Sequence, residues 1–317
     1  MIEVIRYSSF WKEDWDAFVK KSKNGTFLLL RDYMDYNSDR FEDCSLLFRD
    51  EKGNIQALLP ANRCGECLSS HNGLTYGGLL TDDHITTTTV LSAFQALKAW
   101  MKENGLRVLR YKAIPYIYHK VPADEDLYAL TQCFPDIKIE ARDISTTVTL
   151  QTPLPWRELR RRGVRKAGRN GIVVVESDDF NAFWKILDRN LSMKYGTHPV
   201  HSLEEILLLK HRFPEKIRLF LAMKGEEVLA GVLMYDANDT CVHSQYISST
   251  EEGRSQGALD AVFYHLLTSV YTHERYFDFG KSTEGDSSSL NAHLIFQKEG
   301  FGGRGVCYDI YLMSVDN

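Results

Sequence analysis

The order in which strands and helices are expected along the chain most constrains its fold, because one order occurs twice. In the first half, apolar segments separated by turn residues predict a hairpin, a third strand, a helix and a further strand. The threonine run at 86–89 supplies N-cap candidates for that helix. The expected strands are residues 45–49, 55–60, 73–79 and 106–111. A helix between two strands of one unit favours their parallel pairing.

The second half repeats this order at an offset of roughly 170 residues. Its expected elements are strands at 218–223, 228–235, 241–247 and 276–279, and a helix over 256–271. That helix carries a single apolar stripe, which is typical of a helix that covers one face of a sheet. The stripe is formed by Leu259, Val262, Phe263, Leu266 and Val270.

Length and composition are consistent with two folded domains. A chain of 317 residues can form two domains of about 150 residues each, and 44% apolar residues supply two cores. The prolines at 153 and 155 favour an extended connector. We therefore predict domains over residues 1–151 and 152–317, with residues 124–150 adding a short helix and two strands to the first.

Several functional classes are disfavoured by composition. The formal net charge of −5 is too small for the whole surface to attract nucleic acid or membrane, and no segment is apolar enough for a membrane span. The six cysteines form no disulfide framework, which indicates a cytoplasmic protein. Cys64 and Cys67 stand in a CxxC spacing with His71 nearby, but no second pair follows at zinc-site distance, so we expect no metal.

Three local sequences resemble the FemABX-like aminoacyltransferases of bacteria, within the Gcn5-related N-acetyltransferase (GNAT) superfamily. Residues 159–175 resemble the basic helix and strand that open the second domain of those enzymes. YFDFG at 276–280 resembles their DFG strand end, and QKEGFGG at 297–303 resembles their FKxGFGG segment. The resemblance covers the second half well, whereas the first half matches only in the order of its elements.

The resemblance implies an α/β (α+β) fold of two tandem GNAT-like domains, each a mixed, mostly antiparallel sheet flanked by helices. It implies an enzyme, an acyltransferase that forms an amide bond on an amine acceptor. No cofactor is expected to be tightly bound. The expected donor is aminoacyl-tRNA or acyl-CoA, and the expected partners are an amine acceptor such as a cell-wall precursor, and transfer RNA. The oligomeric state is left open.

Two residues are the expected catalytic groups. Lys298 is the counterpart of the lysine that stabilises developing negative charge in Fem-type enzymes, and a compact ammonium suits that role. Tyr246, on the strand at 241–247, is expected to line the cleft. Ordinary acetyltransferases often have a tyrosine that acts as the general acid at the position of Phe296, and phenylalanine has no proton to donate.

Donor and acceptor contacts are expected at two further places. Arg254, Gln256, Gly257 and Ala258 resemble the loop that binds the pyrophosphate of CoA at a helix N-terminus, although Leu259 replaces its last small residue. On the acceptor side, the resemblance implies phosphate contacts from the basic segment after residue 159. The expected substrate-binding residues are Arg165, Lys166, Tyr195 and Lys281.

Two alternatives remain open at the level of sequence. One is an acyl-CoA-dependent N-acetyltransferase, in which Arg254 would contact pyrophosphate. The other is a binding module that kept the fold and lost the chemistry, favoured by the departures at Leu259, Phe296 and Gln297. For the basic segment itself, a solvated helix face competes with a phosphate site.

Overall fold

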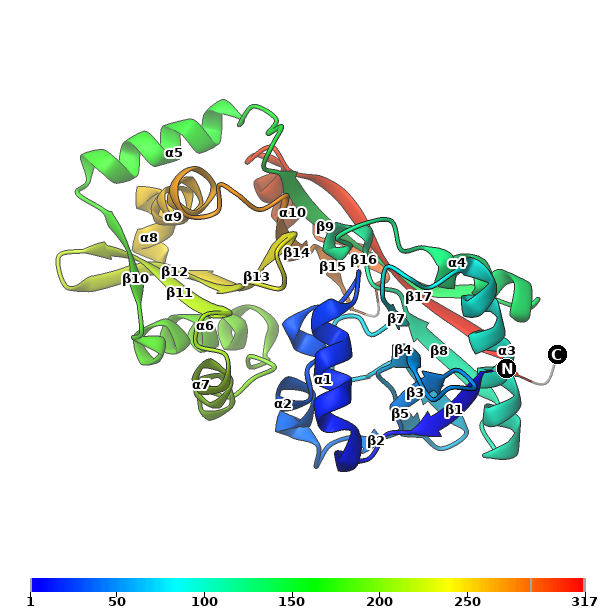
Figure 1. Ribbon diagram of the computed structural model, residues 1–317. Helices are drawn as coiled ribbons and strands as arrows, with labels where there is room; N and C mark the ends of the chain where they lie inside the picture. The colour runs from blue at the N-terminus through cyan, green and yellow to red at the C-terminus, as the bar shows by residue number, and fades with distance from the viewer. Residues whose placement is uncertain (1, 286, 316–317) are drawn as a thin grey trace. The chain divides into compact units, whose positions relative to one another are not determined.

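In the computed structural model of the protein (Figure 1), residues 2–285 and 287–315 are described, apart from the side chain of Tyr195. The chain divides into two compact units. The first contains the residues up to Ile144, Gly285–Ser289 and the chain from Cys307 onward; the second contains Ser145–Glu284 and Leu290–Val306. Strands β9 (Lys138–Thr149) and β17 (Arg304–Ser314) each contribute residues to both units. The domain boundary near residue 151 stays a prediction.

The first unit holds two sets of strands. An antiparallel sheet has the order β1-β3-β4-β7, and a second set has the order β17-β8-β6-β5-β2. The strands are β1 (Glu3–Arg6), β2 (Glu42–Asp43), β3 (Leu46–Arg49), β4 (Ile55–Leu59), β5 (Asn62–Cys64), β6 (Cys67–Ser69), β7 (Leu80–Thr81) and β8 (Val108–Lys112). Strand β8 does pair in parallel, but its partner is β6 and not the strand expected at 73–79.

The helices of the first unit are α1 (Lys12–Lys21), α2 (Arg31–Met34), α3 (Thr87–Glu103) and α4 (Glu125–Cys133), with short 3₁₀ turns at Ser9–Trp11, Phe27–Leu29, Asp35–Asn37 and Tyr116–Tyr118. The side chain of Thr86 accepts from the amide of Thr89, so the expected cap of α3 is confirmed. Val90, Phe94, Leu97 and Met101 of this helix are buried in the core of the unit.

Two expectations for the first half are wrong. Residues 73–79 form no strand, because other groups satisfy their backbone. The Lys112 ammonium donates to the carbonyl of Leu74, and the amides of Gly77 and Leu79 donate to the Lys112 carbonyl and the Tyr111 hydroxyl. The two strands expected within residues 124–150 are a single long strand, β9.

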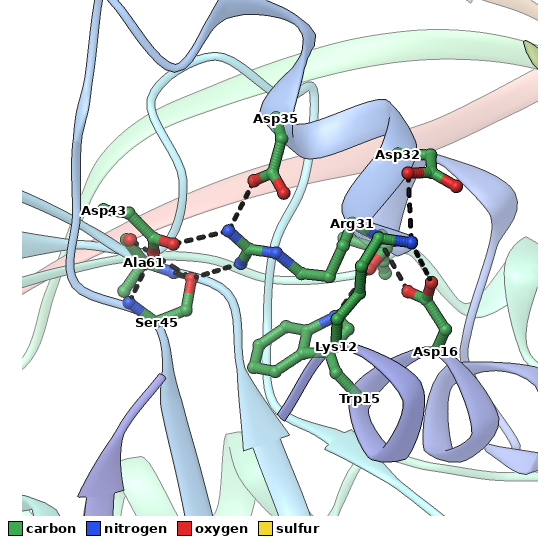
Figure 2. Close-up of polar contacts among 10 residues, drawn as sticks. Lys12, Trp15, Asp16, Arg31, Asp32, Asp35, Asp43, Ser45 and Ala61 are labelled. Carbon is green, nitrogen blue, oxygen red and sulfur yellow. Dashed lines mark hydrogen bonds and ion pairs between the residues drawn. The ribbon is translucent and has the colours of Figure 1, made fainter. Parts of the chain in front are cut away.

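A buried arginine organises the α2 region of the first unit. Figure 2 shows the Arg31 guanidinium between the carboxylates of Asp35 and Asp43, with Ser45 beside it. Arg31 is only 2% exposed, and its guanidinium lies 3.8 Å from the centre of the Tyr7 ring. Two carboxylates therefore compensate one buried cation.

The second unit is built on the strand order β10-β11-β12-β13-β14-β9. Its strands are β10 (Val173–Ser177), β11 (Ile217–Lys224), β12 (Glu227–Tyr235), β13 (Cys241–Ser249) and β14 (Tyr276–Lys281). Neighbours pair antiparallel except β13 and β14, which are parallel. The strands expected at 218–223, 228–235, 241–247 and 276–279 are thus confirmed, and so is the mixed, mostly antiparallel sheet.

The helices of the second unit are α5 (Glu158–Arg169), α6 (Phe180–Tyr195), α7 (Leu203–Arg212), α8 (Glu251–Gln256), α9 (Ala258–His265) and α10 (Ala292–Glu299). A π-helical turn at Leu266–Val270 continues α9. The short strands β15 (Thr283–Glu284) and β16 (Ser289–Leu290) pair with each other. The helix expected over 256–271 is confirmed as α9 and the π-helical turn that continues it to Val270, and its start is set by Gly257, which adopts a left-handed conformation between α8 and α9. Within the described residues, no helix has the length and apolar character that a bilayer crossing requires.

Candidate active site

Strands β13 and β14 are paired only over their first residues. Their register runs from Cys241 opposite Tyr276 to His243 opposite Asp278, and no pair follows although both strands continue. On its other edge β13 carries a bulge, because β12 pairs with Ser244 and then with Tyr246 and skips Gln245. A bulge changes the direction of a side chain or ends the pairing of a strand, and bulges are frequent next to active sites.

A cavity of about 310 Å³ lies where the two strands have separated. Strand β13, helices α6, α9 and α10, and the end of β14 contribute its walls. It is lined by Leu187, Asn190, Leu191, Lys194, Ile247, Ser248, Ser249, Arg254, Leu259, Phe263, Phe279, Leu294, Gln297, Lys298 and Phe301. Apolar walls with a few polar groups are typical of a small-molecule site.

Lys298 is the cavity-lining residue with the most unusual environment. It is 4% exposed, and its ammonium donates to the carbonyls of Gly280 and Lys281, both at 2.8 Å. Burial lowers its pKa to about 8, although the negative charge of Asp278 acts in the opposite direction. An ammonium has three donors, so one is left to point to a group bound in the cavity.

Asp278 lies at the last paired position of β14 and is fully buried. One carboxylate oxygen accepts hydrogen bonds from the hydroxyls of Ser145 and Thr147 on β9, and the other contacts Nδ1 of His243 at 2.8 Å. This pair could not be predicted from local sequence, because it depends on the register of two strands and joins residues that are 35 positions apart.

A second cavity, of about 560 Å³, shares Asn190, Lys194 and Arg254 with the first. Its walls carry four cations and three carboxylates: Lys185, Arg189, Lys194 and Arg254, with Glu227, Glu251 and Glu252. Arg254 donates to the carbonyl of Ser249 at 2.7 Å. The first turn of α8 holds Glu251 and Glu252, which disfavour an anion at that helix N-terminus.

Arg254 is the member of the expected CoA loop that reaches the cavities. Gln256 donates to the carboxylate of Glu252, and Ala258 is fully buried in the core. Gly257 lies at the junction of α8 and α9 with a φ of +80°, and a Cβ there would be 2.4 Å from the carbonyl of Gly163 in α5. The glycine thus permits close packing of α5 on α9, which Figure 1 shows side by side.

Replacing Gly257 by alanine is expected to destabilise the protein more than the same change at Gly171. Both glycines are left-handed, which costs alanine about 1–2 kcal/mol, but a Cβ at Gly171 meets nothing within 4 Å. At Gly257 the overlap with α5 adds about 1–3 kcal/mol. Urea unfolding of the two variants measures the difference, and equal losses would contradict the packing role.

The basic helix α5 has two unlike faces. Arg160 pairs with the buried Asp260 of α9 at 2.7 Å, so this cation stabilises the helix packing. Arg165 is exposed and pairs with Glu158 of its own helix, and Lys166 is exposed. Neither of these two expected substrate contacts lines the two cavities above.

The remaining expected residues lie at the edge of the site. The Tyr246 hydroxyl is 2.7 Å from Nδ1 of His201, and the Tyr246 ring packs on Trp184. Tyr246 is not one of the residues that line the Lys298 cavity. Lys281 contributes its backbone carbonyl to the Lys298 ammonium. The side chain of Tyr195 lies outside the described residues. Phe296 is half exposed, with the Arg157 guanidinium 4.1 Å from its ring centre.

A metal site is not apparent in the described residues. Within residues 2–285 and 287–315, no group of three or more His, Cys, Asp or Glu side chains could hold a metal ion. Cys64 and Cys67 face each other across the β5–β6 hairpin as free thiols.

The fold is similar to that of several solved structures. A crystal structure of FemX superimposes with a TM-score of 0.66 at 13% identity, covering 97% of this chain and 96% of that one. L-PGS from Bacillus licheniformis gives 0.61 at 15% identity, covering 96% and 92%. A Bacteroides thetaiotaomicron protein of unknown function gives 0.64 at 11% identity, covering 99% of both chains. The protein has the FemABX-like fold of tandem GNAT-like domains.

A family model matches part of the second unit. Residues 157–287 match the model described as the acetyltransferase (GNAT) domain. The match spans β10 to β14 and includes the strands that separate around the Lys298 cavity. No curated protein matches the sequence significantly.

Proposed function

We propose that the protein transfers an acyl or aminoacyl group from an activated donor to an amine acceptor, forming an amide in the Lys298 cavity. The observation that carries this proposal is the buried ammonium of Lys298 at the point where β13 and β14 separate. A preorganised cation in a site shielded from water stabilises negative charge strongly and needs no reorganisation during the reaction.

In the proposed reaction, the amine nitrogen attacks the donor carbonyl and a C–N bond forms. The carbonyl oxygen becomes negatively charged in the tetrahedral intermediate, and Lys298 donates a hydrogen bond to it. The bond from carbon to the leaving sulfur or oxygen then breaks. One proton passes from the nitrogen to the leaving group, so that an amide and a thiol or alcohol result.

The donor we favour is an aminoacyl-tRNA. The acidic first turn of α8 is a poor place for the pyrophosphate of CoA, and Gly257 and Ala258 are occupied in helix packing. The second cavity has one more cation than carboxylates on its walls, and we propose its cations as the contacts for phosphates of the donor. For the acceptor we propose an amine on a phosphate-bearing molecule such as a nucleotide-linked cell-wall precursor, with Arg165 and Lys166 as its contacts.

An acyl-CoA donor is the second candidate, because Arg254 lines both cavities and is a cation within reach of a pyrophosphate. The two donors are distinguished by incubating the protein with labelled acetyl-CoA or with tRNA charged with labelled alanine, each with a nucleotide-linked peptide bearing a free lysine amine. Labelled amide from the tRNA alone supports the favoured donor. Tight binding of the peptide without turnover by either donor would instead indicate a binding module.

The pH dependence of kcat is expected to have a basic limb near pH 8. Lys298 is charged below its pKa of about 8 and neutral above it, so the form that stabilises the oxyanion is lost as pH rises through that value. An ordinary lysine would place this limb above pH 10. Rates measured from pH 6 to 10.5 test the prediction, and a plateau up to pH 10 would contradict it.

A further inference from the structure

The imidazole of His243 lies at the junction where the two parallel strands separate. It belongs to β13 and stands opposite Asp278, in the last register pair before the gap. Its Nδ1 is 2.8 Å from the buried carboxylate, and its side chain is 16% exposed. A carboxylate accepts hydrogen bonds, so Nδ1 carries the proton, and the neutral ring has its lone pair on Nε2.

The carboxylate behind His243 is held rigidly. Its second oxygen accepts from the hydroxyls of Ser145 and Thr147, so three side chains from two other strands fix its position. A carboxylate that orients an imidazole in this way sets its tautomer and stabilises the imidazolium after proton uptake. Asp278 is therefore placed to act through His243.

The free edge of the imidazole faces the same residue that anchors Lys298. A Cβ built on Gly280 would be 3.2 Å from Cε1 of His243 and 3.8 Å from its Nε2. The carbonyl of Gly280 accepts the hydrogen bond from Lys298. Gly280 has a φ of +77°, so both its conformation and the space beside it favour glycine. His243 and Lys298 thus contact one short segment at the end of β14.

We propose that His243 is the general base of the transfer and that Asp278 is its positioning residue, an inference that rests on the proposed function. Nε2 takes one proton from the acceptor nitrogen as the C–N bond forms, which gives an imidazolium paired with Asp278. The imidazolium returns that proton to the sulfur or oxygen as its bond to the carbonyl carbon breaks. His243 thus also acts as the general acid for the leaving group, a role that Phe296 cannot fill.

Other charged groups around His243 are compatible with this role. Asp278 contacts it from β14, and the nearby Lys298 ammonium of α10 donates to the Gly280 carbonyl. A second imidazole–carboxylate pair is formed by His198 and Asp188 at 2.6 Å, but its histidine side chain is 75% exposed, whereas that of His243 is 16% exposed.

The test compares His243→Gln with His198→Gln, using whichever labelled donor the wild type accepts and the nucleotide-linked lysine peptide. We expect His243→Gln to lower kcat/KM about 100-fold or more and His198→Gln to leave it unchanged. His243→Ala should regain activity when imidazole is added, in proportion to the free-base concentration, whereas Lys298→Met should not. Circular dichroism and thermal melting establish that each variant is folded.

The outcomes separate the two proposals. An active wild type whose His243→Gln variant keeps its rate overturns the role of His243 and leaves the transferase proposal standing. A folded, slow His243→Ala variant that imidazole fails to restore shows that the histidine is structural, which also overturns the inference. A wild type that forms no amide with either donor removes the proposed function, and the role of His243 with it.

Discussion

Replacing Lys298 by methionine is expected to lower kcat about 100- to 1,000-fold, because removal of one donor to a developing oxyanion has effects of that size. Methionine keeps the length and apolar character of the side chain and removes only the ammonium. The carbonyls of Gly280 and Lys281 then lose a hydrogen bond each. Steady-state kinetics with a saturating donor measure the loss, and the KM of the donor should change much less than kcat.

Lys210 offers a matched control for this substitution. Its ammonium also donates to two backbone carbonyls, those of Pro214 at 2.8 Å and Ile217 at 2.9 Å, but it lies on α7 and lines neither cavity. Lys210→Met therefore removes the same kind of structural contact without touching the site. Equal activity in the Lys298→Met and Lys210→Met variants would show that the buried ammonium has no role in the chemistry.

Replacing Arg31 by methionine is expected to destabilise the protein by about 3 kcal/mol. The substitution leaves Asp35 and Asp43 close together without the cation that compensates them, and breaking a buried ion pair from one side costs about 3–5 kcal/mol. The low end of this range applies because the two carboxylates are partly exposed, Asp35 to 41% and Asp43 to 35%. Urea unfolding at pH 7 measures the change.

Arg6 provides the control, because its pair with Glu42 is exposed on both sides and is worth about 1 kcal/mol or less. Adding Asp35→Asn to the Arg31→Met variant should recover part of the lost stability, since it removes one of the uncompensated charges. If Arg31→Met costs no more than Arg6→Met, the buried arginine does not organise the region shown in Figure 2.

The parts of the fold that could be predicted are those determined by residues close together in the sequence. Apolar segments bounded by turn residues locate β11 to β14, and the threonines at the start of α3 locate its cap, because both signals lie within a few residues. Residues 73–79 read as a strand because nothing nearby in the sequence shows that Lys112 and Tyr111 will satisfy their backbone groups. Tertiary contacts override local preference there.

The candidate site was predictable only in part, for the same reason. Lys298 could be singled out from its resemblance to a known motif, but its burial and its anchors on β14 depend on the packing of α10. The pairing of His243 with Asp278 follows from strand register, and the use of Gly257 in contact with α5 follows from helix packing. Neither relation is encoded in local spacing.

The most direct test of the central claim is a single-turnover measurement of amide formation by the wild type and Lys298→Met. Enzyme in excess over labelled alanyl-tRNA, or over labelled acetyl-CoA, is mixed with the nucleotide-linked lysine peptide and quenched at successive times. The proposed role of Lys298 predicts that the wild type forms a stable amide from one of these donors and that the variant forms it at least 100-fold more slowly. Equal rates in the two proteins, or no amide from either donor, would contradict it.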